Sequence, residues 1–183
     1  TSTTSDGTIK LGSSVAVTVT FSEAVIVSNT PQLTLSTGSS NAVVDYTSGS
    51  GGTTLTFNYT VASGHVSSDL DYASTSALAL NGGTINDANG NAATLTLASP
   101  GASGSLGANK AIIVDTQSPM VASVTSSSNN ASYMIGDVIP INITFSEAVT
   151  VSGTPQLTLS TGSSNAVVDY TSGSGGTTLT FNY

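Results

Sequence analysis

Cysteine and tryptophan are absent from the 183 residues, and only two lysines carry positive charge. Without cysteine no disulfide stabilises the fold, and the sequence carries no redox signal of its compartment. Ten acidic residues give a net charge of −8, which excludes binding to nucleic acid through basic patches. No apolar run approaches the roughly 20 residues of a membrane-spanning helix, so we expect no membrane insertion in this segment.

The remaining composition is that of a folded extracellular structural protein. Only 7% of the residues are charged, so the surface consists mainly of Ser, Thr, Asn and Gly. Such a composition resembles that of a disordered chain, but 38% of the residues are hydrophobic and they alternate regularly with polar ones. We therefore expect an ordered protein that is secreted or displayed on a cell surface.

One stretch of 30 residues occurs twice without a single difference. It reads TPQLTLSTGSSNAVVDYTSGSGGTTLTFNY and spans 30–59 and 154–183, an offset of 124 residues. The match continues upstream, where FSEAVIVSN at 21–29 faces FSEAVTVSG at 145–153. The chain therefore contains about one and a half periods of a tandem repeat, and we expect it to be a piece of a longer array.

Period-two alternation predicts strands throughout the chain. In SVAVTVTF the side chains of Val15, Val17, Val19 and Phe21 share one face, and TLTFNYTV repeats the pattern. Turn residues separate the candidate strands, and no segment has a convincing helical period. The fold class that we predict is all-β, with tandem immunoglobulin-like β-sandwich domains. The other predicted strands are 32–36, 42–47, 70–74, 77–80, 94–97 and 111–115.

The repeat also predicts the domain boundaries. Residues 1–115 form the first immunoglobulin-like repeat, with its first strand incomplete at the N-terminus, and TQSP at 116–119 forms a linker. Residues 120–183 form the N-terminal half of a second, truncated repeat. We expect this half to expose an unpaired sheet edge together with Leu157, Leu159, Val168, Leu179 and Phe181.

Several motifs resemble the bacterial immunoglobulin-like repeats of giant surface adhesins. They are the FSEAV turn, the D-x-x-G-N loop at 87–91 and the VDTQSP junction at 114–119, and the resemblance covers essentially the whole chain. These adhesins include RTX and biofilm proteins and repeats associated with flagellar systems. The resemblance implies a secreted extender that separates a surface anchor from a distal binding module. It also implies calcium at the domain junctions, where the ion stiffens the array.

Catalytic chemistry has little support in the sequence. The single histidine, His65, lies in a predicted loop without a nucleophile motif nearby. Asp69 and Asp71 are two apart on a predicted strand and therefore share a face, but no apolar pocket is evident beside them. We expect them to form a hydrogen-bonded corner beside Tyr72, and we expect no enzyme.

Four carboxylates are candidate calcium ligands: Glu23, Asp87, Asp115 and Glu147. Extracellular modules bind Ca²⁺ through carboxylates and backbone carbonyls. We expect the loop that holds Glu23 to lie near the loop of Asp87, and Asp115 to approach Glu147 across the junction. The alternative is ordinary turn chemistry, because Asp and Asn in NDANGN are also what a tight turn requires.

Three functions follow from these observations. The first is a structural extender whose partners are the neighbouring repeats of the same chain. The second is a subunit of an extracellular filament, in which an exposed edge pairs with another copy by strand addition. The third is ligand binding by threonine faces such as Thr18 with Thr20.

Overall fold

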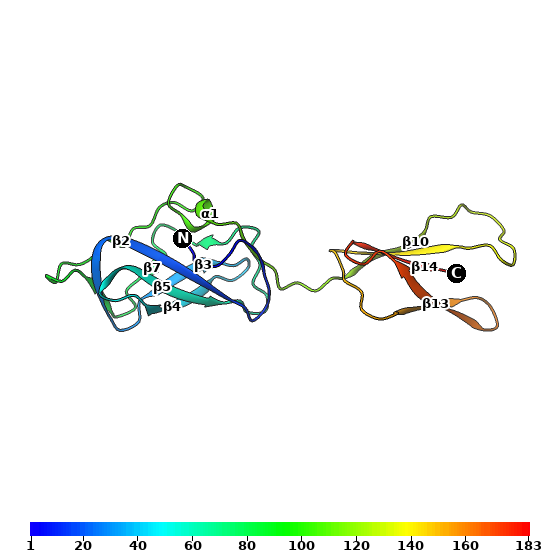
Figure 1. The fold of residues 1–183 in the computed structure, drawn as a ribbon, viewed down its shortest axis with the longest axis horizontal. Coiled ribbons are helices and arrows are strands. Elements are labelled where there is room, and N and C mark those ends of the chain that lie inside the picture. The colour runs from blue at the N-terminus through cyan, green and yellow to red at the C-terminus, as the bar shows by residue number, and fades with distance from the viewer. The chain divides into compact units, whose positions relative to one another are not determined.

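The computed structural model describes residues 1–183, which divide into two compact units. Unit 1 spans Thr1–Gln117 and unit 2 spans Ser118–Tyr183 (Figure 1). Strands are almost the only regular secondary structure in each unit, and no helix is long and apolar enough to span a bilayer. The prediction of an all-β, sandwich-like fold is therefore confirmed.

Unit 1 is organised around one long strand, β2 (Ser14–Ser28). Its first half pairs antiparallel with β5 (Gly52–Thr60), from Ser14 opposite Thr60 to Thr20 opposite Thr54. The register then shifts, and Ile26–Ser28 pair with β8 (Thr84–Asn86). The remaining strands of this sheet are β3 (Gln32–Ser36), β4 (Ala42–Ser48), β6 (Asp71–Tyr72) and β7 (Leu78–Ala79), and the order is β6-β3-β4-β5-β2-β8 with β7 beside β3.

The core of unit 1 is formed by the alternating residues of these strands. Val15 and Val17 of β2 pack in one cluster with Leu33 and Leu35 of β3 and with Phe57 of β5. All five are essentially inaccessible to solvent. Strands that lie apart in the sheet order contribute to the same cluster. The sheet therefore folds over on itself and encloses the core between two layers, as in a sandwich.

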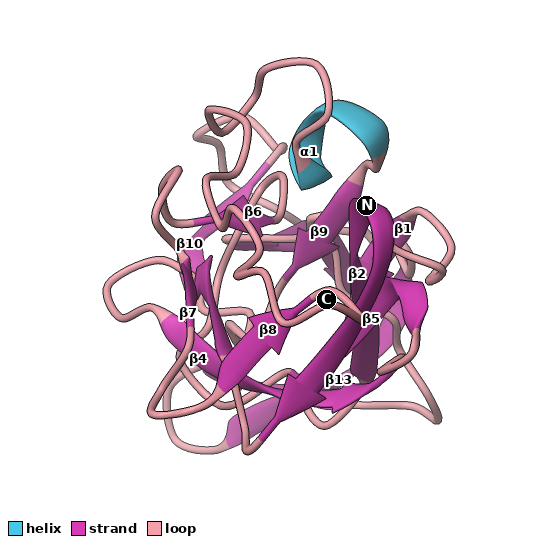
Figure 2. Cartoon of the chain, turned by 90° about the vertical axis from the view of Figure 1, so that its left-hand side faces the viewer, coloured by secondary structure: helices cyan, strands magenta, loops and turns pink.

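Smaller elements complete unit 1. β1 (Gly7–Ile9) pairs in parallel with β9 (Ile112–Val114), and an ion pair of 2.8 Å between Lys110 and Asp6 lies beside this pair. The only helix, α1 (Leu106–Asn109), begins at Ser105, whose hydroxyl accepts a hydrogen bond from the Ala108 amide. In Figure 2 this helix lies close to β6 and β9.

Unit 2 contains five strands in the order β10-β11-β14-β13-β12. Val168, Leu179 and Phe181 are nearly inaccessible to solvent. Leu157 and Leu159 are half-buried, so the expectation that these five side chains are exposed is wrong. Other apolar side chains of the unit remain open to solvent, among them Val121, Val124 and Ile135. The strands are β10 (Val121–Ser126), β11 (Pro140–Phe145), β12 (Gln156–Ser160), β13 (Asn165–Ser172) and β14 (Thr178–Asn182).

The structure adds β1, β8 and α1, which the alternation does not predict, and it differs from the prediction at FSEAV and at residues 94–97. FSEAV does not form a turn in unit 1, because β2 runs through it as a bulge between Thr20 and Val25. Residues 94–97 do not join a strand ladder, although Leu95 and Leu97 alternate with exposed threonines as predicted. An alternating segment needs a partner strand to form a ladder, and no part of the chain pairs with this one.

Candidate functional site: a groove along an open strand edge

The N-terminal segment of unit 1 pairs with the outer edge of β2. Thr1 and Thr18 exchange two backbone hydrogen bonds of 2.9 and 2.8 Å, and Ser2 lies opposite Val17 in an isolated bridge. The Ser2 hydroxyl also donates to the Ala16 carbonyl at 2.7 Å. This pairing covers the edge of β2 only as far as Thr18.

Beyond Thr18 the same edge of β2 is open. Backbone groups along a strand face its two neighbours alternately, so those of Thr20 point outward like those of Thr18. No segment of the chain pairs with Val19, Thr20 or Phe21 on this side. Of the described residues, Thr1–Thr4 bond to this edge, and none pairs with it beyond Thr18.

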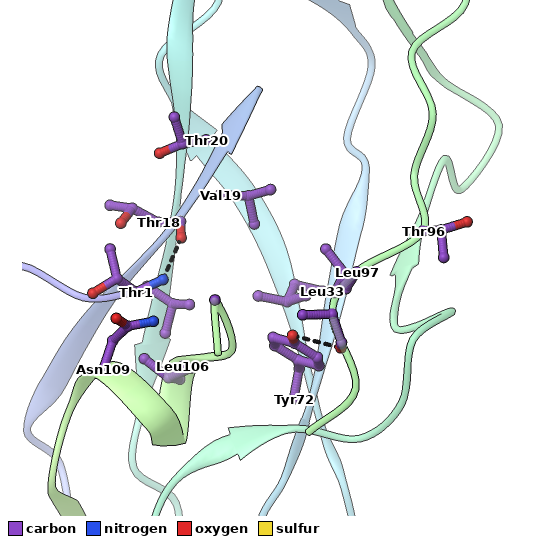
Figure 3. A pocket seen from close by; sticks show the side chains of 13 residues that line it. Thr1, Thr18, Val19, Thr20, Leu33, Tyr72, Thr96, Leu97, Leu106 and Asn109 are labelled. Carbon is purple, nitrogen blue, oxygen red and sulfur yellow. Dashed lines mark hydrogen bonds between the residues drawn. The ribbon is translucent and has the colours of Figure 1, made fainter. Parts of the chain in front are cut away.

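Two hollows lie along this edge and together form what we call the β2 groove. Each measures about 390 Å³, and Thr20 and Thr96 line both. In Figure 3, Thr18, Val19 and Thr20 lie along one side of the first hollow, while Thr96 and Leu97 lie along the other.

The far wall of the β2 groove is the extended segment 91–98 that contains the predicted strand 94–97. A backbone hydrogen bond of 2.9 Å from the Leu97 amide to the Thr75 carbonyl connects this segment to the rest of unit 1. Leu95 and Leu97 are half-buried against the core, while Thr94 and Thr96 face solvent. The groove thus has an apolar floor and polar rims.

A buried carboxylate holds one end of the groove in place. The Asp71 side chain accepts hydrogen bonds from the amides of Tyr72 at 2.8 Å, Leu106 at 3.1 Å and Gly101 at 3.0 Å. The Tyr72 hydroxyl donates to the Ala98 carbonyl at 2.7 Å, and desolvation with the nearby Asp71 charge raises the pKa of this phenol. The predicted hydrogen-bonded corner is confirmed for Asp71, whereas Asp69 is exposed.

The single histidine joins a loop to the end of unit 1. His65 Nδ1 lies 2.8 Å from the Tyr59 hydroxyl, and the two rings stack. The Thr116 hydroxyl donates to the His65 carbonyl at 2.9 Å, so this loop is fastened to the chain that leaves β9. Burial raises the pKa of Tyr59 to about 12. These contacts hold the His65 loop against the end of β5 and the chain that follows β9.

The structure places the four predicted calcium ligands in different settings. Glu23 is exposed on β2, and it lines the second hollow together with Asp87 and Asn91. Asp115 accepts a hydrogen bond from the Gln117 amide at 3.0 Å, which is turn chemistry. Glu147 belongs to unit 2, so the pair expected across the junction is divided between the two units.

Asp87 is already well supplied with hydrogen-bond donors. Its carboxylate accepts from the side-chain amide of Asn91 at 2.7 Å and from the backbone amides of Asn89 and Asn91 at 2.8 Å each. These bonds, the Asn91 side chain first, lower the pKa of Asp87. Calcium requires six to eight oxygens. No group of three or more His, Cys, Asp or Glu side chains placed to hold a metal ion occurs in the structure.

The first hollow of the β2 groove lies where the sequence predicts an incomplete first strand, whereas the second hollow was not predicted. A signal was present, because 94–97 alternates like a strand and the N-terminal residues align with the end of a strand in the second repeat. Comparison with known proteins adds no further guide, since no family model, curated protein or solved structure matches the chain.

Proposed function

We propose that the chain is a structural extender, built of tandem immunoglobulin-like repeats, in a large secreted bacterial adhesin. The observation that carries this proposal is that the two copies of the repeated stretch fold alike, each with its own internal bonds. A spacer requires interchangeable units that are stable without specific neighbours. Its action is mechanical, since a strand of about ten residues adds roughly 33 Å of length.

The agreement between the copies extends to individual side chains. Gln32 donates to Asp45 at 2.9 Å in unit 1, and Gln156 donates to Asp169 at 2.9 Å in unit 2. The tyrosine of β4 and its counterpart in β13 each accept a backbone amide of the following turn at 2.8 Å. Both tyrosines also meet a phenylalanine edge-to-face at 74°.

Force spectroscopy on the full chain tests whether unit 1 bears load as one body. An extender should unfold unit 1 in a single event that releases about 350 Å of chain, given roughly 3.4 Å per extended residue. Extension without a discrete event would contradict the proposal. Saturable binding of a glycan by the threonine faces would favour the ligand-binding alternative instead.

The second candidate is a filament subunit held by strand addition between molecules. The observation that favours it is the set of apolar side chains of unit 2 that are exposed to solvent. Val121 and Val124 are each 58% exposed and Met134 is 79% exposed. Exposed apolar residues beside free strand edges are typical of assembling proteins. Sedimentation velocity distinguishes the candidates, because only the filament subunit should associate as its concentration rises.

Calcium is a separate proposal that rests on Glu23 and Asp87 in the second hollow. Thermal unfolding of the full chain in millimolar calcium and in chelator tests it. A higher midpoint in calcium that Glu23→Gln abolishes would support binding there, whereas loss of the effect only with Glu147→Gln would move the site to unit 2. An unchanged midpoint would contradict calcium binding and indicate that Asp87 only stabilises its own turn.

A further inference from the structure

The imidazole ring of His65 accepts two hydrogen bonds at a single nitrogen atom. The Ala62 backbone amide donates to Nδ1 at 3.3 Å, and the Tyr59 hydroxyl lies 2.8 Å from the same atom. A backbone amide can only donate, so Nδ1 carries a lone pair rather than a proton. The proton of the neutral ring is therefore assigned to Nε2, and the Tyr59 hydroxyl is a second donor to Nδ1.

The loop that carries this ring also holds the chain that leaves unit 1. The Thr116 hydroxyl donates to the His65 carbonyl at 2.9 Å and accepts from the Gly64 amide at 3.1 Å, so both of its partners belong to the same turn. One residue pair earlier, Ser67 and Val114 exchange two backbone hydrogen bonds of 2.8 Å each. Thr116 thus depends on the turn around His65, whereas Val114 has a partner of its own.

A proton on Nδ1 is incompatible with this arrangement. The Ala62 amide then points its hydrogen at another N–H group and loses its acceptor, and the Tyr59 hydroxyl has to rotate and accept instead. Histidine is the side chain that ordinarily changes charge between pH 5 and 8. Acidification through this range therefore removes the bonds that orient the turn. It leaves the pairing of Ser67 with Val114 intact, because only backbone groups take part in it.

The other titratable groups around the ring keep their charge over the same range. Burial raises the pKa of Tyr59 to about 12, so its phenol stays neutral. Carboxylates ordinarily titrate at about pH 4 and lysine at about pH 10. His65 is therefore the group in this region whose charge changes between pH 5 and 8. The groups on the surrounding elements are Tyr59 of β5, Asp45 of β4, which lines the same hollow as the ring, Asp115 after β9 and Lys10 before β2.

We propose that His65 is a pH-sensitive latch on the chain that leaves unit 1. The neutral ring holds the turn in the shape that bonds Thr116, and the protonated ring releases the turn together with Thr116. The latch is closed above the titration of the ring and opens as the pH falls through it. This inference rests on contacts within unit 1 and does not depend on the extender or the filament function. In an extender, the latch makes the chain that follows the repeat more mobile in acid than at neutral pH.

Hydrogen exchange of the full chain between pH 5 and 8, followed by NMR, tests the latch. The Gly64 amide is the reporter, and the Val114 amide is the internal reference that removes the intrinsic pH dependence of exchange. Relative to Val114, Gly64 should lose about tenfold of its protection in acid, which corresponds to one neutral hydrogen bond. The midpoint of this loss should coincide with the titration of the ring signals of His65, the single histidine of the chain.

Variants separate the ring from the other groups. His65→Ala has no acceptor for the Ala62 amide, so Gly64 should exchange rapidly at every pH. Thr116→Val removes the hydroxyl and should have the same effect on Gly64 while the His65 ring still titrates. The matched control Asp115→Asn removes the neighbouring charge and should keep the full pH dependence.

Two results would overturn the latch. Unchanged relative protection of Gly64 from pH 8 to pH 5 in the unchanged chain would show that the stacking of the imidazole on the Tyr59 ring holds the turn in both charge states. A pH dependence that persists in His65→Ala would assign the change to another group. Neither result bears on the extender function, which force spectroscopy tests separately.

Discussion

The three amides on the Asp71 carboxylate allow a sharp prediction about the stability of unit 1. Asp71→Ala removes the acceptor for the amides of Tyr72, Leu106 and Gly101. Leu106 is fully buried and Tyr72 nearly so, so water cannot replace the carboxylate at these two amides. The Gly101 residue is exposed and can bond to solvent instead.

The expected loss follows from the two buried amides. A hydrogen bond to a charged group contributes about 1.5–3 kcal/mol, so the loss of two such bonds in Asp71→Ala should lower the free energy of unfolding by about 3–6 kcal/mol. For a unit of this size 1 kcal/mol corresponds to about 4 °C, which predicts a fall of about 12–24 °C in the midpoint. Asp71→Asn keeps one acceptor oxygen for Tyr72 and Leu106 but turns an amide group toward the Gly101 amide. Its cost should be smaller, at about 1–2 kcal/mol.

Calorimetry of the full chain measures these changes. Hydrogen exchange at the Leu106 amide identifies which transition belongs to unit 1. Asp69→Asn is the matched control, because Asp69 is exposed, and its effect should remain within about 0.5 kcal/mol. A fall below about 4 °C for Asp71→Ala would refute the argument. So would equal falls for the substitutions at 69 and 71.

Two further predictions concern Tyr59 and Gly49. Burial raises the pKa of Tyr59 from near 10 to about 12, so the folded state holds the phenol proton more tightly than the unfolded state does. The resulting contribution to the free energy of unfolding is fully present below about pH 10 and should be lost as the pH rises toward 12. Urea denaturation at about pH 9 and at about pH 11.5 measures this loss as the difference between the two free energies of unfolding. The difference should be smaller in Tyr59→Phe than in the control Tyr183→Phe, which changes an exposed ring. Gly49 has φ +112° and a Cβ there would collide with the Thr54 carbonyl oxygen, so Gly49→Ala should cost about 3 kcal/mol or more. Gly51→Ala meets no atom within 4 Å and should cost about 1 kcal/mol, and equal effects of the two changes in a urea titration would contradict the steric argument.

Period-two patterning predicted the principal strands well because their residues alternate between core and solvent. Strand β3 has the predicted bounds, Gln32–Ser36, and β4 differs by one residue at its end. The course of β2 through FSEAV was not predictable in this way, because a bulge interrupts the alternation while the hydrogen bonds continue on either side. The short β1 and β8 have too few residues to show any period.

The candidate site was less predictable than the fold. Residues 94–97 carry the pattern of a strand, but pairing depends on a partner segment, and alternation does not reveal which one. The role of Asp71 was predictable from its place beside Tyr72, whereas the two amides from 101 and 106 come from a loop of no recognisable period. The incomplete pairing along β2, by contrast, follows from the repeat, because its offset of 124 residues predicts that the first strand of repeat 1 is incomplete.

The identity of the two repeated stretches also creates a hazard during folding. Strand β14 carries the same sequence as the matching part of β5, the native partner of β4. A misfolded β4–β14 pair would therefore gain the same cross-strand contacts as the native β4–β5 hairpin. Chain connectivity is what discriminates between them. A short turn separates Ser48 from Gly52, while about 130 residues separate Ser48 from Thr178, and this difference in loop closure favours the native hairpin by about 3 kcal/mol. Rapid closure of the SGSGG turn therefore decides which copy each strand joins, and slowing it would populate misassembled chains with native-like hairpins.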